Sequence, residues 1–190
     1  CVVQIDASKP AASTVALTSV ATVGGVTIDG DDTLLVNAGG RLIINYTGSS
    51  PAATIRGYLA SGCNGGLWTG TGIASSAAAS AGNTAVGWID DGHAITVRYT
   101  LYGDATLDGT VNFGDLLALS QNYNTSGKQW IDGDSDYDGF VNFADLLRLS
   151  QNYNQSLPSA HGPGAAVPEP GALTGLLVLA SLAAIRRRRR

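Results

Sequence analysis

The sequence of 190 residues contains no Met, one Glu, two His and two Cys. His93 and His161 have no further metal-binding residue at a telling spacing, which argues against a zinc site. The one glutamate, Glu169, lies near the C-terminus, so no glutamate pair is available for glycoside hydrolysis. No residue pattern pairs a nucleophile with a base. We therefore expect no catalytic site in this chain.

Basic residues are also few. Lys and Arg number 11 against 15 Asp and Glu, and the net charge is −4. Five of the basic residues form the run Arg186–Arg190 beside an apolar segment, so the chain lacks the basic surface that binds nucleic acid. Cys1 and Cys63 could form a disulfide or remain two thiols. With no charged and apolar leader at its start, the chain is expected to be the C-terminal part of a longer protein.

One unit of sequence occurs twice, at residues 104–124 and 134–154. With places counted from Asp104 and from Asp134, oxygen-bearing side chains stand at places 1, 3, 5, 9 and 12 of each unit, and Gly stands at place 6. This is the spacing of an EF-hand calcium loop, apart from Asp instead of Glu at place 12. The predicted ligands, with the carbonyl at place 7, are Asp104, Thr106, Asp108, Thr110, Asn112 and Asp115 for one ion and Asp134, Asp136, Asp138, Phe140, Asn142 and Asp145 for the other.

The chemistry of calcium explains this spacing. The ion takes six to eight oxygen ligands at about 2.3–2.6 Å, so a short loop must turn sharply around it. Gly109 and Gly139 allow that turn because Gly tolerates a positive φ. The first loop has Thr106 where the second has Asp136, and with one charge fewer it is expected to bind calcium more weakly. The alternative is a pair of Asp/Gly turns that cap two helices without metal.

A helix is predicted after each loop. Asn112 and Asn142 suit the N-cap, with Asp115 and Asp145 three residues later. Trp130 is expected to cover the seam between the helices. Because each helix is too short to be stable alone, metal binding should contribute to folding. Spacings of three and four predict that the helices pack through one apolar face each, made of Phe113, Leu116, Leu117 and Tyr123 and of Phe143, Leu146, Leu147 and Tyr153.

Two loop–helix units with Asp at place 12 and no helix before the loop resemble the type I dockerin domain. The resemblance implies an all-α pair that holds two Ca²⁺ ions and binds a cohesin-like protein. Dockerins contact cohesins through places 10 and 11, where small hydroxyl residues are common. Here these places hold Phe113 and Gly114 in the first unit and Phe143 and Ala144 in the second, which departs from that pattern.

Upstream of the repeats the sequence predicts short strands and two helices. Residues 1–48 are expected to form a sandwich or the last rungs of a β-solenoid, and residues 49–103 a mixed α/β segment. Helices are predicted at Pro51–Ser61 and Ile73–Ser80. The predicted strands are Val2–Ile5, Thr14–Leu17, Val20–Ile28, Thr33–Val36, Arg41–Tyr46, Ala85–Ile89 and Ala94–Tyr102. The order of these segments resembles the C-terminal portion of large exported proteins of planctomycete type.

Downstream, residues 156–166 are expected to be a flexible linker. Residues 167–190 combine Pro168-Glu169-Pro170 with an apolar run at 171–185 and the terminal arginines. This order resembles a PEP-CTERM sorting signal, which implies insertion in a membrane and processing by an exosortase. An ordinary membrane anchor is the alternative.

The predicted fold class is multi-part: a β-rich N-terminal region with short helices, an all-α dockerin-like pair at 104–155, and a C-terminal hydrophobic helix. The predicted function is that of an exported, envelope-associated, non-enzymatic protein whose calcium-stabilised module gives structural support or docks a partner. The alternative is the C-terminal fragment of a secreted polysaccharide-degrading enzyme whose catalytic domain lies upstream.

Overall fold

The computed structural model describes residues 2–5 and 13–158. Residues 1–157 form one compact unit, and residues 158–190 belong to a second unit, most of which lies outside the described range. The predicted sorting signal at Pro168–Pro170 and the apolar run at 171–185 therefore lie outside the described residues, as does Cys1. Within the described part of the chain, no helix combines the length and apolarity that a membrane span needs.

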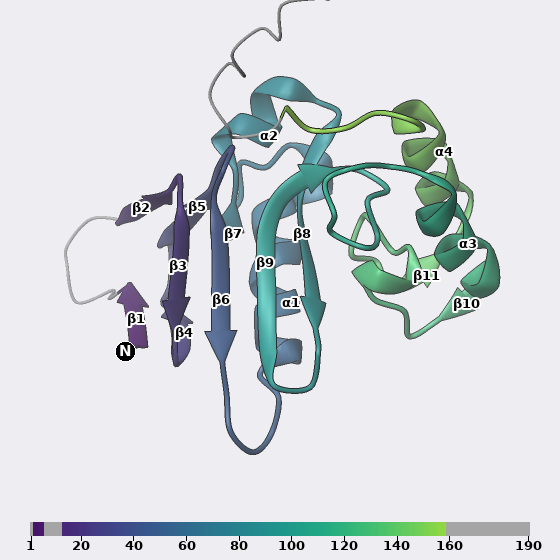
Figure 1. The fold of residues 1–190 in the computed structure, drawn as a ribbon. Helices are drawn as coiled ribbons and strands as arrows, with labels where there is room; N and C mark the ends of the chain where they lie inside the picture. The colour runs from purple at the N-terminus through teal and green to yellow at the C-terminus, as the bar shows by residue number, and fades with distance from the viewer. Residues whose placement is uncertain (1, 6–12, 159–190) are drawn as a thin grey trace, which may run out of the picture. The chain divides into compact units, whose positions relative to one another are not determined.

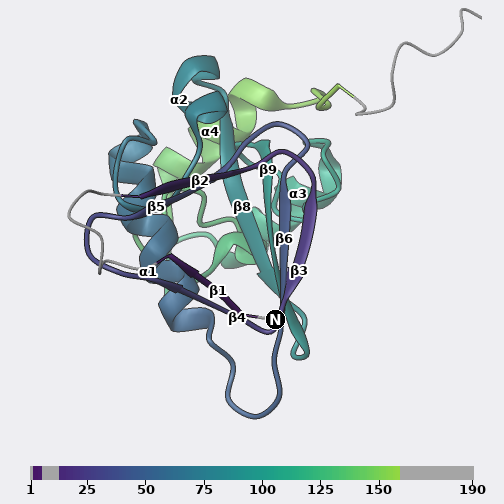
Figure 2. The same cartoon turned by 90° about the vertical axis from the view of Figure 1, so that its left-hand side faces the viewer.

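The six N-terminal strands form two stacked turns of chain, each with three strands on three sides (Figure 2). Each strand of the first layer pairs in parallel with its successor in the second, in the pairs β1–β4, β2–β5 and β3–β6. The strands are β1 (Val2–Ile5), β2 (Thr14–Leu17), β3 (Val20–Val23), β4 (Gly25–Ile28), β5 (Thr33–Val36) and β6 (Arg41–Asn45). The expected strand Val20–Ile28 is divided at Gly24, where the chain turns from β3 into β4.

Alternating side chains of the second layer form its core. In β5, Leu34 and Val36 are buried, and in β6, Leu42 and Ile44 are buried, while their neighbours along the strands are partly or fully exposed. This is the period of two that a strand imposes on its side chains. Two further strands extend the sheets: β7 (Gly72–Ala74) joins β5 in parallel, and β9 (Ala94–Leu101) joins β6 antiparallel.

The strand β8 (Thr84–Asp90) pairs with β9 and completes a four-stranded sheet of order β3-β6-β9-β8 (Figure 1). Asp91 closes the β8–β9 hairpin, because its Oδ1 accepts the backbone N–H groups of His93 and Ala94 at 2.9 and 2.7 Å. The aspartates at this turn therefore have a structural role, as turn-forming Asp residues commonly do.

Two α-helices follow β6 in the sequence and precede β8. The helix α1 (Ala52–Cys63) begins after Ser50, whose Oγ accepts the N–H of Ala52, and ends where Asn64 turns left-handed. The short helix α2 (Ser76–Ala81) begins after Ser75, whose Oγ accepts the N–H of Ala78. Helix Ile73–Ser80 was predicted here, but residues 72–74 pair with β5 as β7, so the helix begins only after the Ser75 cap.

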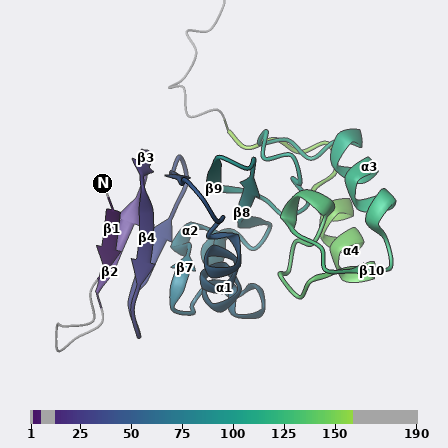
Figure 3. The same ribbon diagram turned by 90° about the horizontal axis from the view of Figure 1, so that it is seen from below.

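Residues 104–157 contain two helices and a small sheet, shown beside α1 and β8 in Figure 3. The helices are α3 (Phe113–Asn122) and α4 (Phe143–Asn152). Between them, β10 (Thr125–Ser126) pairs antiparallel with β11 (Phe140–Val141). A short 3-10 turn, η2 (Trp130–Asp132), lies in the connection.

The predicted fold class is wrong. Residues 2–5 and 13–158 form a β-rich structure with four short α-helices, and the repeat region is not an all-α pair, since β10 and β11 form a sheet within it. The physical reason is that each loop ends in an extended segment just before its helix, and these segments pair with neighbouring backbone: Phe140–Val141 with β10, and Thr110 with Ser156. A C-terminal hydrophobic helix is not among the described elements. The predicted domain boundaries stay predictions.

The contact between α1 and β7 yields a stability test. A Cβ added to Gly62 would lie 1.9 Å from the carbonyl oxygen of Ile73, whereas one added to Gly57, on the same helix, meets nothing within 4 Å. We expect Gly62→Ala to destabilise the protein by about 1–3 kcal/mol through overpacking. Gly57→Ala should stabilise it by roughly 0.5–1 kcal/mol, because Ala is the better helix former. Urea unfolding of both variants measures this, and equal effects would contradict the close packing.

Candidate metal centre

The first loop starts directly after β9. Asp104 is fully buried, and its Oδ2 accepts the backbone N–H of Gly109 at 2.9 Å and the hydroxyl of Thr100. At the other end, Asp115 is also fully buried, and its two oxygens accept the N–H groups of Thr106 and Asn112 at 3.0 and 2.9 Å. The carboxylates at places 1 and 12 of the loop therefore accept hydrogen bonds from backbone N–H groups between them.

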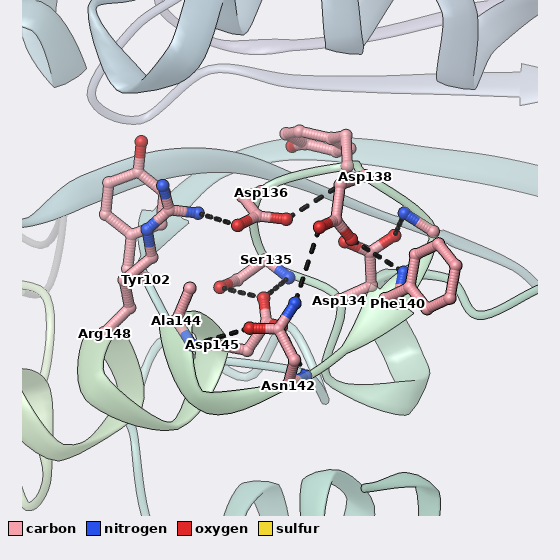
Figure 4. A network of polar contacts seen from close by, with 12 residues as sticks. Tyr102, Asp134, Ser135, Asp136, Asp138, Phe140, Asn142, Ala144, Asp145 and Arg148 are labelled. Atoms are coloured by element: carbon pink, nitrogen blue, oxygen red, sulfur yellow. Dashed lines mark hydrogen bonds and ion pairs between the residues drawn. The ribbon is translucent and has the colours of Figure 1, made fainter. Parts of the chain in front are cut away.

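The second loop repeats the hydrogen bonds from places 6 and 9, whereas its carboxylate at place 12 accepts the N–H of place 2 instead of place 3 (Figure 4). Asp134 Oδ2 accepts the N–H of Gly139 at 3.0 Å. Asp145 Oδ1 accepts the N–H of Ser135 at 2.8 Å, and its Oδ2 accepts the N–H of Asn142 at 3.0 Å. Asp134 and Asp145 are 1% and 0% exposed, so this pair of carboxylates is as deeply buried as the pair in the first loop.

Backbone conformation is repeated between the loops as well. Gly109 and Gly139 at place 6 have φ of 93° and 86°, as predicted from the need for a sharp turn. Leu107 and Tyr137 at place 4 are also left-handed, with φ of 56° and 65°. A left-handed conformation is rare for such bulky side chains and is retained only where the surroundings impose it.

The two asparagines at place 9 are occupied with starting the helices. Asn112 Oδ1 accepts the N–H of Gly114, and Asn142 Oδ1 that of Ala144, both at 2.7 Å. Asp115 and Asp145 complete capping boxes by accepting the N–H of the cap residue. The predicted N-caps are confirmed. As calcium ligands these asparagines would need a water or a rotated amide, which EF-hand loops accept at this place.

The donor set of the second loop fits a hard divalent cation. Asp134, Asp136 and Asp138 each offer an oxygen, and the three lie within 4.8 Å of one another. The Oδ1 atom of Asp134 is buried and has no hydrogen-bond partner among the described residues. Burial, and next the charge of Asp145, raise the pKa of Asp134 to about 7. Carboxylate oxygens gathered in this way are the ligands that calcium prefers.

The first loop has fewer carboxylates but the same framework. Thr106 stands at place 3, where its Oγ1 lies 3.1 Å from Asp115 Oδ1. Asp108 Oδ1 accepts the N–H of Thr110, as Asp138 Oδ1 accepts that of Phe140, both at 2.7 Å. Burial raises the pKa of Asp104, as it does for its counterpart in the second loop. Thr110 and Phe140, both at place 7, therefore make the same turn contact with the aspartate at place 5.

Residues upstream of the repeats support both loops, and sequence reasoning missed them. The Arg98 guanidinium donates to the carbonyl oxygen of Leu107 at 2.6 Å. Arg56 donates to the carbonyl oxygen of Tyr137 at 2.8 Å and lies 3.8 Å from Asp134 Oδ2. Both contacts fall at place 4, the left-handed residue. The available signal was that each arginine is an isolated charge within an otherwise uncharged strand or helix.

The apolar contacts of the repeats differ from the prediction. Trp130 does not cover the seam between α3 and α4: it lies in the large core with Trp88 and Tyr137, and its Nε1 donates to the carbonyl oxygen of Asp104 at 2.7 Å. Gly87 makes room for it, since a Cβ there would lie 2.5 Å from the indole ring. Trp130 therefore packs the segment between β10 and β11 against β8.

The predicted helix-packing face is wrong. Leu119 and Leu149 are buried and form the cluster between the helices, together with Leu101, Val111 and Val141. Leu116 and Leu146 pack against this cluster in part. The other residues predicted for that face are exposed, namely Phe113, Leu117, Tyr123, Phe143, Leu147 and Tyr153. A spacing rule identified apolar residues on the helices, but not which of them face the neighbouring element.

Comparison with known proteins gives little. No family model matches the chain, and no curated protein matches it. Among solved structures it is similar to a type II cohesin-dockerin domain from Bacteroides cellolosolvens, with 28% identity over 30% of this chain and 88% of that chain, at a TM-score of 0.26.

The shared core predicts cooperative unfolding. Trp68, Trp88 and Trp130 are each at most 2% exposed and belong to one cluster, which also contains Leu107 and Tyr137 from the two loops. We expect near-UV circular dichroism of these tryptophans and far-UV circular dichroism to report a single thermal transition. Calcium chloride should raise both midpoints together. Separate midpoints for the two signals would contradict a common core.

Proposed function

We propose that residues 104–155 bind two calcium ions and that these ions stabilise the whole unit of residues 1–157. The observation that carries the proposal is the unpartnered, buried Oδ1 of Asp134 beside the carboxylates of Asp136 and Asp138. A buried ionised carboxylate is costly unless it is paired or binds a metal. Calcium supplies the positive charge and the coordination that this oxygen lacks.

The first loop supports a second site of the same kind. Its hydrogen bonds from Gly109 to Asp104 and from Asn112 to Asp115 match those of the second loop in partner and in length. Asp104, Asp108 and Asp115 would hold the ion with Thr106.

We propose structural support and protein docking, rather than catalysis, as the use of this module. The duplicated apolar side chains on the helices support docking: Phe113 and Phe143 are each 66% exposed, and Leu117 and Leu147 are 44% and 46% exposed. Exposed apolar groups gathered on one module are typical of interaction sites. A cohesin-like protein is the proposed partner. The adjacent pair Asp90 and Asp91 supports a non-enzymatic role, since both carboxylates accept backbone N–H groups of the β8–β9 turn.

The same proposal places the protein in the cell envelope after export. The support is the sequence of residues 167–190, with Pro168-Glu169-Pro170, an apolar run and five arginines. Exosortase would process this signal, and residues 171–185 would hold the chain in the membrane beforehand.

Calcium titration calorimetry of the 190-residue chain tests the calcium site. We expect two bound ions, and removal of calcium by EDTA should lower the helicity and the melting temperature. Asp134→Ala and Asp145→Ala should each weaken one of the two sites by more than about tenfold, because an end ligand is lost. The exposed Asp31, outside the loops, provides the matched control Asp31→Ala, which should keep both sites.

A second readout separates metal binding from folding. In EDTA, Asp134→Ala should differ little in stability from the wild type, because the loss of the hydrogen bond from Gly139 is offset by the removal of a buried carboxylate whose pKa is raised to about 7. With calcium, the same variant should be the less stable of the two. A wild-type protein that takes up no calcium and melts identically with and without EDTA would overturn the proposal.

A further inference from the structure

The two repeats differ in charge at only two of their aligned positions. Place 3 is Thr106 in the first copy and Asp136 in the second, and the middle of the following helix is Ala118 in the first copy and Arg148 in the second. The two changed residues meet in the structure: Arg148 Nη1 lies 3.3 Å from Asp136 Oδ2 (Figure 4). The additional negative charge of the second loop therefore occurs together with an additional positive one.

Arg148 is held in place and is not a mobile surface charge. Its guanidinium lies over the ring of Tyr102, 4.9 Å from the ring centre. Tyr102 is buried, and its hydroxyl accepts the Nε1–H of Trp68 at 2.8 Å. The Arg148 side chain is 24% exposed. A guanidinium that is stacked on an aromatic ring and largely removed from water acts more strongly on a neighbouring carboxylate than an exposed one does.

The charges around the two loops balance to the same value. The first loop has three carboxylates, Asp104, Asp108 and Asp115, and one contacting arginine, Arg98. The second loop has four carboxylates, from Asp134, Asp136, Asp138 and Asp145, and two contacting arginines, Arg56 and Arg148. Each loop with its arginines therefore sums to minus two, which one calcium ion neutralises. A neutral sum suits loops that pack against an apolar core.

We propose that Arg148 is a positioning residue that holds Asp136 and cancels its charge, so that the two loops bind calcium with similar affinity. This inference rests on the proposed calcium function. It changes the expectation from the sequence alone, in which Asp136 makes the second site the tighter one. Ligand charge sets the calcium affinity of such loops, and a fixed arginine beside one ligand subtracts from that charge.

Site-resolved titration with calcium chloride tests the inference on the 190-residue chain. The backbone N–H groups of Gly109 and Gly139 each donate to the first aspartate of their loop, so their amide resonances report the two sites separately. Arg148→Ala should tighten calcium binding at Gly139 by about tenfold and leave Gly109 unchanged, as expected from removing one nearby unit charge. Arg148→Lys, which keeps the charge, is the matched control and should change little.

Two further variants make the test independent of how Arg148→Ala folds. Ala118 is the half-buried counterpart of Arg148 in the first repeat, and Ala118→Arg should weaken binding at Gly109 by about tenfold. The double change Asp136→Thr with Arg148→Ala gives the second loop the charges of the first and should restore similar affinities.

The outcomes distinguish this inference from the calcium function on which it rests. Wild-type amides that respond to calcium, with Arg148→Ala and Arg148→Lys giving equal affinities at Gly139, would overturn the role of Arg148 alone. Wild-type resonances of Gly109 and Gly139 that do not respond to millimolar calcium would overturn the calcium function and the role of Arg148 with it. A wild-type second site that is tenfold tighter than the first would also contradict the balance of charges.

Discussion

Four carboxylates lie at the ends of the two loops, and all are at most 1% exposed: Asp104, Asp115, Asp134 and Asp145. Burying a carboxylate is tolerated when its oxygens accept hydrogen bonds and a cation offsets its charge. The backbone donors of the loops meet the first requirement. Place 6 of each loop is a left-handed glycine whose N–H donates to the carboxylate at place 1. The second requirement is what makes the loops candidates for calcium.

The same carboxylates connect the loops to the sheet that precedes them. Asp104 accepts the hydroxyl of Thr100 from β9, and its carbonyl oxygen accepts the Nε1–H of Trp130. Arg98, on the same strand, reaches the carbonyl oxygen of Leu107. In the second loop, the hydroxyl of Tyr137 donates to the carbonyl oxygen of Val86 on β8. The two loops proposed to bind calcium are therefore joined to the β8–β9 hairpin by direct hydrogen bonds, without an intervening linker.

Local features of this protein could be predicted from the sequence, and long-range ones could not. The helix caps at Asn112 and Asn142 and the turns at Gly109 and Gly139 depend on residues a few places apart, and each was identified correctly. Short strands such as Thr33–Val36 follow from β-branched runs bounded by Gly and Asp. The ligand spacing predicted the second loop, where three carboxylates gather as expected.

The errors come from contacts between segments far apart in the chain. Arg56 and Tyr137 are separated by 81 residues, and no periodicity or spacing relates them. The exposure of Phe113 and the burial of Leu119 depend on how α3 is rotated against η2 and α4, which a spacing of three or four does not fix. The prediction that Trp130 covers the seam between the helices is wrong for the same reason, since Gly87 on β8, which makes room for its ring, lies about forty residues upstream.

The place of Leu107, Trp130 and Tyr137 in the upstream core has a consequence for how such a protein can be altered. A module that buries its apolar side chains only against one another can be excised and fused to another protein. Here, cutting the chain before residue 104 would remove three large side chains from the core that they share with β8. Both fragments would then expose apolar surface that is buried in the intact protein. A fusion protein that contains these two loops therefore also needs the β8–β9 hairpin.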